Sequence, residues 1–338
     1  MNIKKICLIL VVVAILLGFG VALLNVNHNE NSEEVVASGN NNIIDHTVQN
    51  QKINIVASNF ASYDFLRAII GNVKGIELKF LLGPGKDAHS YDPTAQDLIT
   101  MQNADLLVYI GGEMEGWADR VIDTLDSKDI DIFCIADFVE TMEEKEVDGA
   151  EEEEEEEEEE SAFDEHIWTS PENAIKMVKA LETEMCKIDT KNSGTYRVNA
   201  ENYIAKIQEV DNQIQNIVDN KVRDRLVFGD KMPMQYFIDY YGLEVSAAFD
   251  GCSTETEPSA KTIAYLQDKA KEEKIPVILY IELNDGRVAK VIASEVGNGC
   301  KALQIQSLHN VSLNDFNNGE TWVSLMTKNV DVLKEALQ

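Results

Sequence analysis

Three histidines of the chain occupy positions from which they could bind a metal ion. The sequence has five histidines, of which His28 and His46 fall in a polar stretch close to the N-terminus. His89, His166 and His309 each fall in a predicted loop, just after a strand or just before a helix. Neutral imidazoles that converge suit zinc, copper, iron or nickel, and a nearby carboxylate can complete the shell. These residues favour a metal site if the fold brings them together.

Helix start signals follow two of these histidines closely. Thr94 and Asp97 form a predicted capping box after His89, and Ser170 with Pro171 predicts a helix start after His166. A single loop histidine is usually satisfied by a neighbouring carbonyl group, but three at the ends of strands are harder to explain in that way. The sequence contains no glycine-rich phosphate loop, nucleophile elbow or His-Glu-x-x-His motif. We therefore expect a binding protein and not an enzyme.

Short apolar runs alternate with amphipathic stretches along most of the chain. This alternation predicts parallel sheets covered by helices on both faces. Two successive helices are predicted at 171–187 and about 195–218, and the same order of elements starts again after Arg225. We predict an α/β fold with two lobes, each a mostly parallel four-stranded sheet flanked by helices, joined by a long connecting helix. The predicted strands are residues 53–57, 76–82, 105–110 and 130–135, then 226–229, 244–248, 277–281 and 302–307.

The predicted division of the chain follows from this pattern. It comprises an N-terminal membrane segment, a linker, a first lobe, the connecting helix and a second lobe: residues 1–25, 26–51, 52–192, 193–220 and 221–338. Ligands of open α/β sheets bind at the carboxyl ends of the strands, so a cleft between the lobes is the expected binding place.

The N-terminal segment predicts the compartment. Lys4 and Lys5 precede an uncharged apolar run of nineteen residues, 6–24, which as a helix would span roughly 28 Å, close to the hydrocarbon core of a bilayer. The basic flank should stay in the cytoplasm, so the body is expected at the outer face of the cytoplasmic membrane. We interpret the run as an uncleaved anchor, and a cleaved signal peptide with secretion is the alternative.

Residues 143–165 hold much of the acidic charge. They carry sixteen acidic side chains and one lysine, about half of the net charge of −31. The acidic chain argues against a nucleic-acid partner. We predict a solvated, disordered loop here, and the alternative is a weak electrostatic role in concentrating cations near the cleft. The cysteines lack the spacing of a thiolate metal site, although Cys252 and Cys300 could pair outside the cytoplasm.

Three stretches of the first half resemble the cluster A-I solute-binding proteins, the zinc and manganese receptors of ABC importers. Residues 87–97, Asp-Ala-His-Ser-Tyr-Asp-Pro-Thr-Ala-Gln-Asp, are similar to the family segment Asp-Pro-His-x-Tyr-Glu-Pro-Thr. Residues 164–174, Asp-Glu-His-Ile-Trp-Thr-Ser-Pro-Glu-Asn-Ala, are similar to Asp-Pro-His-x-Trp-Leu-Asp-Pro-x-Asn-Ala. Residues 104–117 resemble the stretch between them. The resemblance covers residues 52–338 and implies that His89 and His166 are the first two metal ligands.

The second half departs from the family pattern. The resemblance implies a histidine or glutamate ligand shortly before Tyr236, but Lys231 stands there, and a protonated lysine cannot bind a metal. Asp230 is the nearest substitute, and His309 falls at or next to the place of the fourth ligand. Glu282 corresponds to a family glutamate that we interpret as orienting a ligand or a water molecule.

The resemblance implies a metal-capturing receptor with the ligands His89, His166, His309 and Asp230. Three imidazoles and one carboxylate favour Zn²⁺ as the transported ligand, whereas a contribution from Glu282 would favour Mn²⁺. The implied partner is an ABC permease in the membrane, and the receptor is expected to be a monomer. The alternatives are a surface adhesin or scaffold stabilised by the metal, and a metal-dependent hydrolase.

Overall fold

The computed structural model describes residues 52–125, 130–150, 163–251 and 257–338. Its first sheet has the strand order β2-β1-β3-β4, and every pairing is parallel. Alternate residues of the central strand β1 enter different cores: Ile55 packs with α2 and Val56 with α3 and α4. Apolar side chains on both faces explain why residues 55–57 of this strand are all apolar. The bounds are β1 Ile53–Ala57, β2 Ile76–Phe80, β3 Leu106–Tyr109, β4 Asp131–Cys134, α2 Phe60–Ile70, α3 Ala95–Gln102 and α4 Trp117–Ile122.

The second sheet repeats the arrangement with the order β6-β5-β7-β8, again parallel. Val227 of β5 faces α8 and α9, whereas Phe228 belongs to the large core on the other side of the sheet. The predicted fold class is therefore confirmed. The bounds are β5 Arg225–Lys231, β6 Glu244–Phe249, β7 Val277–Tyr280, β8 Lys301–Gln304, α7 Gln235–Tyr241, α8 Ala260–Glu272, α9 Arg287–Val296, α10 Leu313–Asn317 and α11 Trp322–Leu337.

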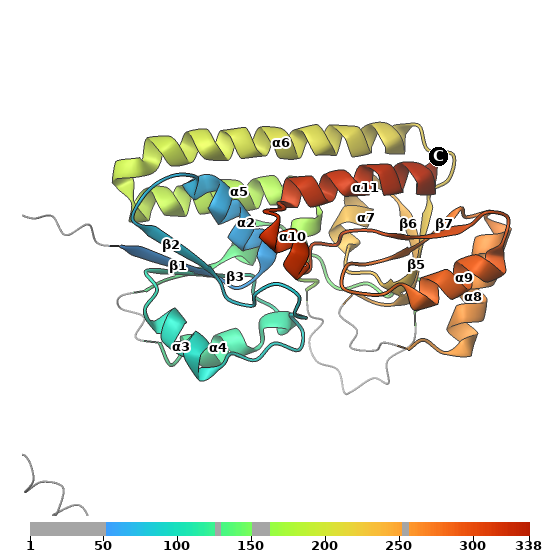
Figure 1. The fold of residues 1–338 in the computed structure, drawn as a ribbon, viewed down its shortest axis with the longest axis horizontal. Helices are drawn as coiled ribbons and strands as arrows, with labels where there is room; N and C mark the ends of the chain where they lie inside the picture. The colour runs from blue at the N-terminus through green and yellow to red at the C-terminus, as the bar shows by residue number, and fades with distance from the viewer. Residues whose placement is uncertain (1–51, 126–129, 151–162, 252–256) are drawn as a thin grey trace, which may run out of the picture. The chain divides into compact units, whose positions relative to one another are not determined.

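The long helix α6 (Ser193–Asp219) joins the two lobes. It packs against α2 and α5 (Pro171–Ile188) of the first lobe and against α11, and it runs over both sheets in Figure 1. One hydrophobic core contains side chains of both sheets together with α6 and α11. Because this core is continuous, a wide hinge motion would have to open packed apolar surface, so the two lobes are held firmly.

Residues 142–148 form a segment that crosses from the first lobe to the second. The backbone N–H of Met142 donates to the Tyr236 hydroxyl at 3.0 Å, and that of Val147 donates to Asp250 Oδ1 at 2.9 Å. Asp148 pairs with Ser246 at the edge of β6 and forms an ion pair with Arg225 at 3.1 Å. The prediction of a disordered loop over all of 143–165 was thus too broad. The crossing segment is ordered by acceptors that are remote in sequence, and residues 151–162 lie outside the described residues.

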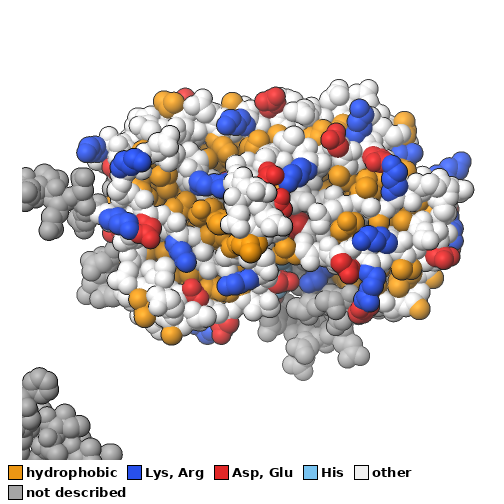
Figure 2. Space-filling view, viewed as in Figure 1, with side chains coloured by type: hydrophobic (Ala, Val, Ile, Leu, Met, Phe, Trp, Pro, Cys, Tyr) orange, Lys and Arg blue, Asp and Glu red, His pale blue; other side chains and the backbone are white. Residues whose placement is uncertain are grey.

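Two other expectations also fall outside the described residues. These are the membrane segment at 6–24 and the pairing of Cys252 with Cys300. Across residues 52–338, apart from the undescribed stretches, no helix is long and apolar enough to cross a membrane. On the face in Figure 2, acidic and basic side chains are interspersed among hydrophobic ones, so this face carries no large area of one charge.

Candidate metal centre

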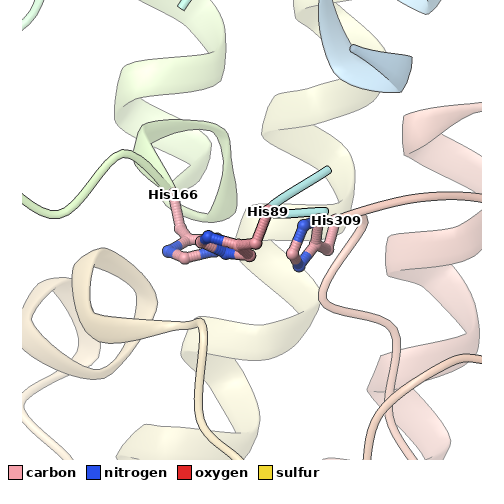
Figure 3. A group of neighbouring side chains, drawn as sticks. All are labelled: His89, His166 and His309. Carbon is pink, nitrogen blue, oxygen red and sulfur yellow. The ribbon is translucent and has the colours of Figure 1, made fainter. Parts of the chain in front are cut away.

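The three predicted histidines lie together between the two lobes. His89 lies in the loop between β2 and α3, His166 directly precedes the short 3-10 helix Ile167–Thr169, and His309 lies between β8 and α10. Each offers one ring nitrogen, and these three nitrogens lie within 4.8 Å of one another. The ring centroids are 4.9–5.7 Å apart, and Figure 3 shows the three rings side by side.

All three histidines share one local backbone arrangement. In each case an oxygen of the side chain two residues earlier accepts the histidine backbone N–H. The donor–acceptor distances are 2.9 Å from His89 to Asp87, 2.8 Å from His166 to Asp164 and 3.3 Å from His309 to Ser307. Such short side-chain turns fix the direction of the backbone without a helix or strand. The spacing Asp-x-His or Ser-x-His is the sequence signal from which these turns could have been predicted.

The Nε2 atoms of the three rings are buried and have no hydrogen-bond partner among the residues that the structure describes. A buried polar atom without a partner costs about 1–3 kcal/mol, so three such atoms in one place call for an explanation. A bound cation would satisfy all three at once. The arrangement fits a metal that accepts imidazole nitrogen, above all zinc, copper, iron or nickel.

Asp164 orients the ring of His166. Its Oδ1 lies 2.8 Å from Nδ1 of His166, and both side chains are buried. When Nδ1 donates to this carboxylate, Nε2 keeps its lone pair for a metal. Burial lowers the pKa of His166, but the charge and hydrogen bond of Asp164 outweigh it, so the pKa is raised overall.

The other two imidazoles have lowered pKa values. Burial, followed by the charge of His166, lowers the pKa of His89 to about 4. Burial and the two neighbouring histidines hold the pKa of His309 well below its usual value, and Lys231 contributes in the same direction. Both rings are therefore neutral at pH 7 and can offer a lone pair without losing a proton.

Asp230 is not part of the group of ligand atoms within 4.8 Å. Its Oδ1 accepts the backbone N–H of Lys231 at 2.9 Å and its Oδ2 accepts that of Ile281 at 3.0 Å. The carboxylate is thus engaged at the ends of β5 and β7. Of the four predicted ligands, the structure brings together the three histidines and leaves Asp230 with its backbone partners.

Glu282 supports the loop that carries His309. Its carboxylate accepts the backbone N–H and hydroxyl of Ser307, at 2.7 and 2.9 Å, and the backbone N–H of Asn310 at 3.4 Å. Leu308 between them has a φ of 62°, a left-handed conformation that a leucine rarely adopts. Burial raises the pKa of the Glu282 carboxyl group. Glu282 therefore contacts the ligand loop and holds its unusual backbone.

Trp168 links the two ligand loops across the lobes. Its indole N–H donates to the carbonyl of Ser307 at 3.0 Å, and its own carbonyl accepts the indole N–H of Trp322 at 2.9 Å. Its ring also lies against His166, with centroids 5.3 Å apart. Trp168 was not among the predicted site residues, although it lies in the Asp-Glu-His-Ile-Trp segment that carried the resemblance.

The fold has two α/β lobes with parallel sheets, joined by a long helix, and three imidazoles converge between the lobes. These features define a two-lobed binding protein with a candidate metal centre. The chain belongs to the ZnuA family, described as zinc-uptake complex component A, periplasmic, which matches residues 55–336. The membership predicted from the sequence motifs is thereby confirmed.

Curated relatives and a solved structure support this assignment. The chain is 30% identical over 286 residues to the high-affinity zinc uptake system protein ZnuA of Bacillus subtilis, covering 85% of this chain and 88% of that protein. It is 29% identical over 284 residues to the zinc-binding lipoprotein AdcA of Streptococcus pneumoniae, covering 84% of this chain but only 56% of AdcA. The Zn(II)-bound ZnuA-like domain of the pneumococcal AdcA is 28% identical, with a TM-score of 0.69, over 85% of this chain and 99% of that structure.

Proposed function

We propose that this chain captures zinc outside the cytoplasmic membrane and delivers it to the permease of an ABC importer. The observation that carries the proposal is the convergence of three ring nitrogens within 4.8 Å in a buried place. The names of the curated relatives, which refer to zinc binding and zinc uptake, support the choice of cargo. The ligands we propose are His89, His166 and His309. Asp230 stays a prediction, since both of its oxygens already accept backbone N–H groups.

The donor set favours zinc over manganese. Three imidazoles suit zinc, whereas manganese prefers carboxylate and water oxygens. We propose that the receptor works as a monomer, held at the outer face of the membrane by residues 6–24 or released if that segment is cleaved. Its partners are the metal ion and the permease, without nucleic acid. The adhesin alternative has no specific observation in its favour.

The direct test is zinc binding by the purified protein and by its His166→Ala variant. Competition with a zinc chelator of known affinity should show one tight site in the parent and at least about a hundredfold weaker binding in the variant, because a buried ligand is lost. His46→Ala removes a histidine of the predicted linker and should bind like the parent. If His166→Ala binds zinc as tightly as the parent, the site is wrongly assigned. A deletion strain should also grow poorly when zinc is scarce and recover when zinc is added.

A further inference from the structure

Three imidazoles leave one position of a tetrahedral zinc shell to be filled. The nearby carboxylates behind the histidines already accept hydrogen bonds. Asp164 accepts from His166, Asp230 accepts from two backbone N–H groups, and Glu282 accepts from the His309 loop, defined as residues 305–312. These bonds engage both oxygens of Asp230 and of Glu282, and Asp164 is engaged by the ring and the backbone of His166. The solvent side of the histidines is the direction that these three groups leave for a fourth protein ligand.

Asp87 lies on that side, in the first lobe. Its Oδ1 is 3.9 Å from Nε2 of His309 across the lobe boundary, and its side chain is 49% exposed. The same oxygen accepts the backbone N–H of His89 at 2.9 Å, so Asp87 is tied to one ligand and faces another. Two donor atoms on one tetrahedral zinc lie about 3.3 Å apart, so the carboxylate needs to approach by only about half an ångström.

A cavity connects Asp87 and His309 with solvent. It has a volume of about 240 Å³ and is lined by residues 85–87 of the first lobe and by residues 281–283, His309 and Asn310 of the second. Leu283 on its wall is 50% exposed. An ion that enters through this access cavity reaches Asp87 and His309 before the deeper His166, whose side chain is fully buried.

The loop that carries Asp87 is fixed to the second lobe. The amide of Asn310 donates to the carbonyls of Gly83 and Lys86, and the backbone N–H of Gly85 donates to Val311 at 2.9 Å. These bonds run from the residues just before Asp87 to the residues just after His309. The short distance between Asp87 and His309 is therefore built into the contact between the lobes.

We propose that Asp87 is the carboxylate that meets the ion in the access cavity and completes its shell as the fourth ligand. This inference rests on the proposed function, because it assumes that the three histidines bind zinc. A carboxylate at the solvent side attracts the hydrated cation, and its negative charge partly neutralises the bound Zn²⁺. Asp87 lies outside the group of nitrogens within 4.8 Å and closes onto the ion from the cavity.

The test compares Asp87→Asn with the parent protein. The asparagine oxygen can still accept the His89 N–H, so the local turn is preserved while the anionic ligand is removed. We expect zinc affinity, measured by chelator competition, to fall at least about tenfold. We also expect the visible spectrum of the Co²⁺-loaded protein to change, because it reports the ligands around the ion. Asp92→Asn is the matched control: it removes one charge from the same loop at an 85% exposed side chain, and its affinity and spectrum should equal those of the parent.

Two outcomes would show that Asp87 is not the fourth ligand and would leave the proposed function intact. One is an Asp87→Asn protein with parental zinc affinity, and the other is weaker binding with an unchanged cobalt spectrum, which would reduce Asp87 to an electrostatic role. A loss of both affinity and parental spectrum in Asp230→Asn, with neither in Asp87→Asn, would assign the fourth position to Asp230. Failure of the proposed function would look different, because the parent itself would then bind zinc no more tightly than His166→Ala.

Discussion

The two lobes hold their histidines by different means. His166 of the first lobe has a carboxylate directly on its ring, since Asp164 lies 2.8 Å from Nδ1. His309 of the second lobe has its backbone N–H bound to the Ser307 hydroxyl, and Glu282 binds that same serine. One ring is therefore oriented by a carboxylate that binds its own nitrogen, whereas the other is positioned through the backbone that carries it.

This difference indicates which substitutions should alter the zinc affinity of the site most. A carboxylate on the imidazole raises the basicity of the ligand and fixes its tautomer. A network behind the loop affects only the position of the ring. We therefore expect changes around His166 to alter metal binding most, and changes around His309 to alter stability as much as binding.

Among the residues that support the ligands, the largest expected effect on zinc affinity comes from Asp164→Asn. Oδ1 of Asp164 accepts both the backbone N–H and the ring N–H of His166. The asparagine oxygen can still accept both, but it has no charge, so His166 loses a charge-assisted hydrogen bond. Zinc affinity should fall about 10- to 100-fold, measured by chelator competition, while the circular dichroism spectrum stays that of the parent. Ser307→Ala removes the hydroxyl that accepts the His309 backbone N–H in the second lobe. It should lower zinc affinity only a few-fold. Equal losses in the two variants would mean that the lobes do not differ as the geometry indicates.

The pH dependence of zinc affinity tests the same difference between His166 and the other two histidines. An imidazole must be neutral to bind zinc. His89, with a pKa of about 4, and His309, with a strongly lowered pKa, are already neutral near pH 6, but the pKa of His166 is raised above its usual 6.5. Affinity should therefore fall as pH drops through the pKa of His166, at about tenfold per pH unit with one proton released per ion.

Chelator competition at several pH values between 5.5 and 8 measures this slope. In Asp164→Asn the pKa of His166 should be lower, because the anionic partner is gone, and the proton-linked region should move to lower pH. A slope near three protons per ion would contradict the prediction, since all three imidazoles would then titrate together.

Much of the fold could be predicted from the sequence because its signals are local. The predicted strand at 53–57 has the observed bounds, the helix predicted at 171–187 ends one residue later than predicted, and the capping box at Thr94 and Asp97 is present. The crossing segment was missed because its partners Tyr236 and Asp250 are remote in sequence. The short helix α10 was also missed.

The site was predictable in part for a related reason. Loops after parallel strands meet at one end of a sheet, which favoured a common place for the histidines. That the three rings converge could not be predicted from their positions in the sequence. Asp230 follows the same rule by position, yet the backbone N–H of Ile281 on the neighbouring strand binds its carboxylate. Sequence position predicts which end of the sheet a side chain lies at, but the hydrogen bonds that engage it there depend on strands paired through long-range contacts.

The smallest expected effect on binding comes from Glu282→Gln. The glutamine keeps one acceptor oxygen but presents an NH₂ group where Ser307 or Asn310 now donates to the carboxylate. The lost bonds should lower the free energy of unfolding of the metal-free protein by about 1–3 kcal/mol, measured by urea denaturation. Zinc affinity should fall only a few-fold, through a less well-positioned His309. The control is Glu272→Gln, at an exposed residue of α8. It should leave the free energy of unfolding and the free energy of zinc binding unchanged within about 0.5 kcal/mol. A large loss of affinity with unchanged stability would instead make Glu282 a metal ligand, and the two lobes would then both contribute a carboxylate directly to the centre.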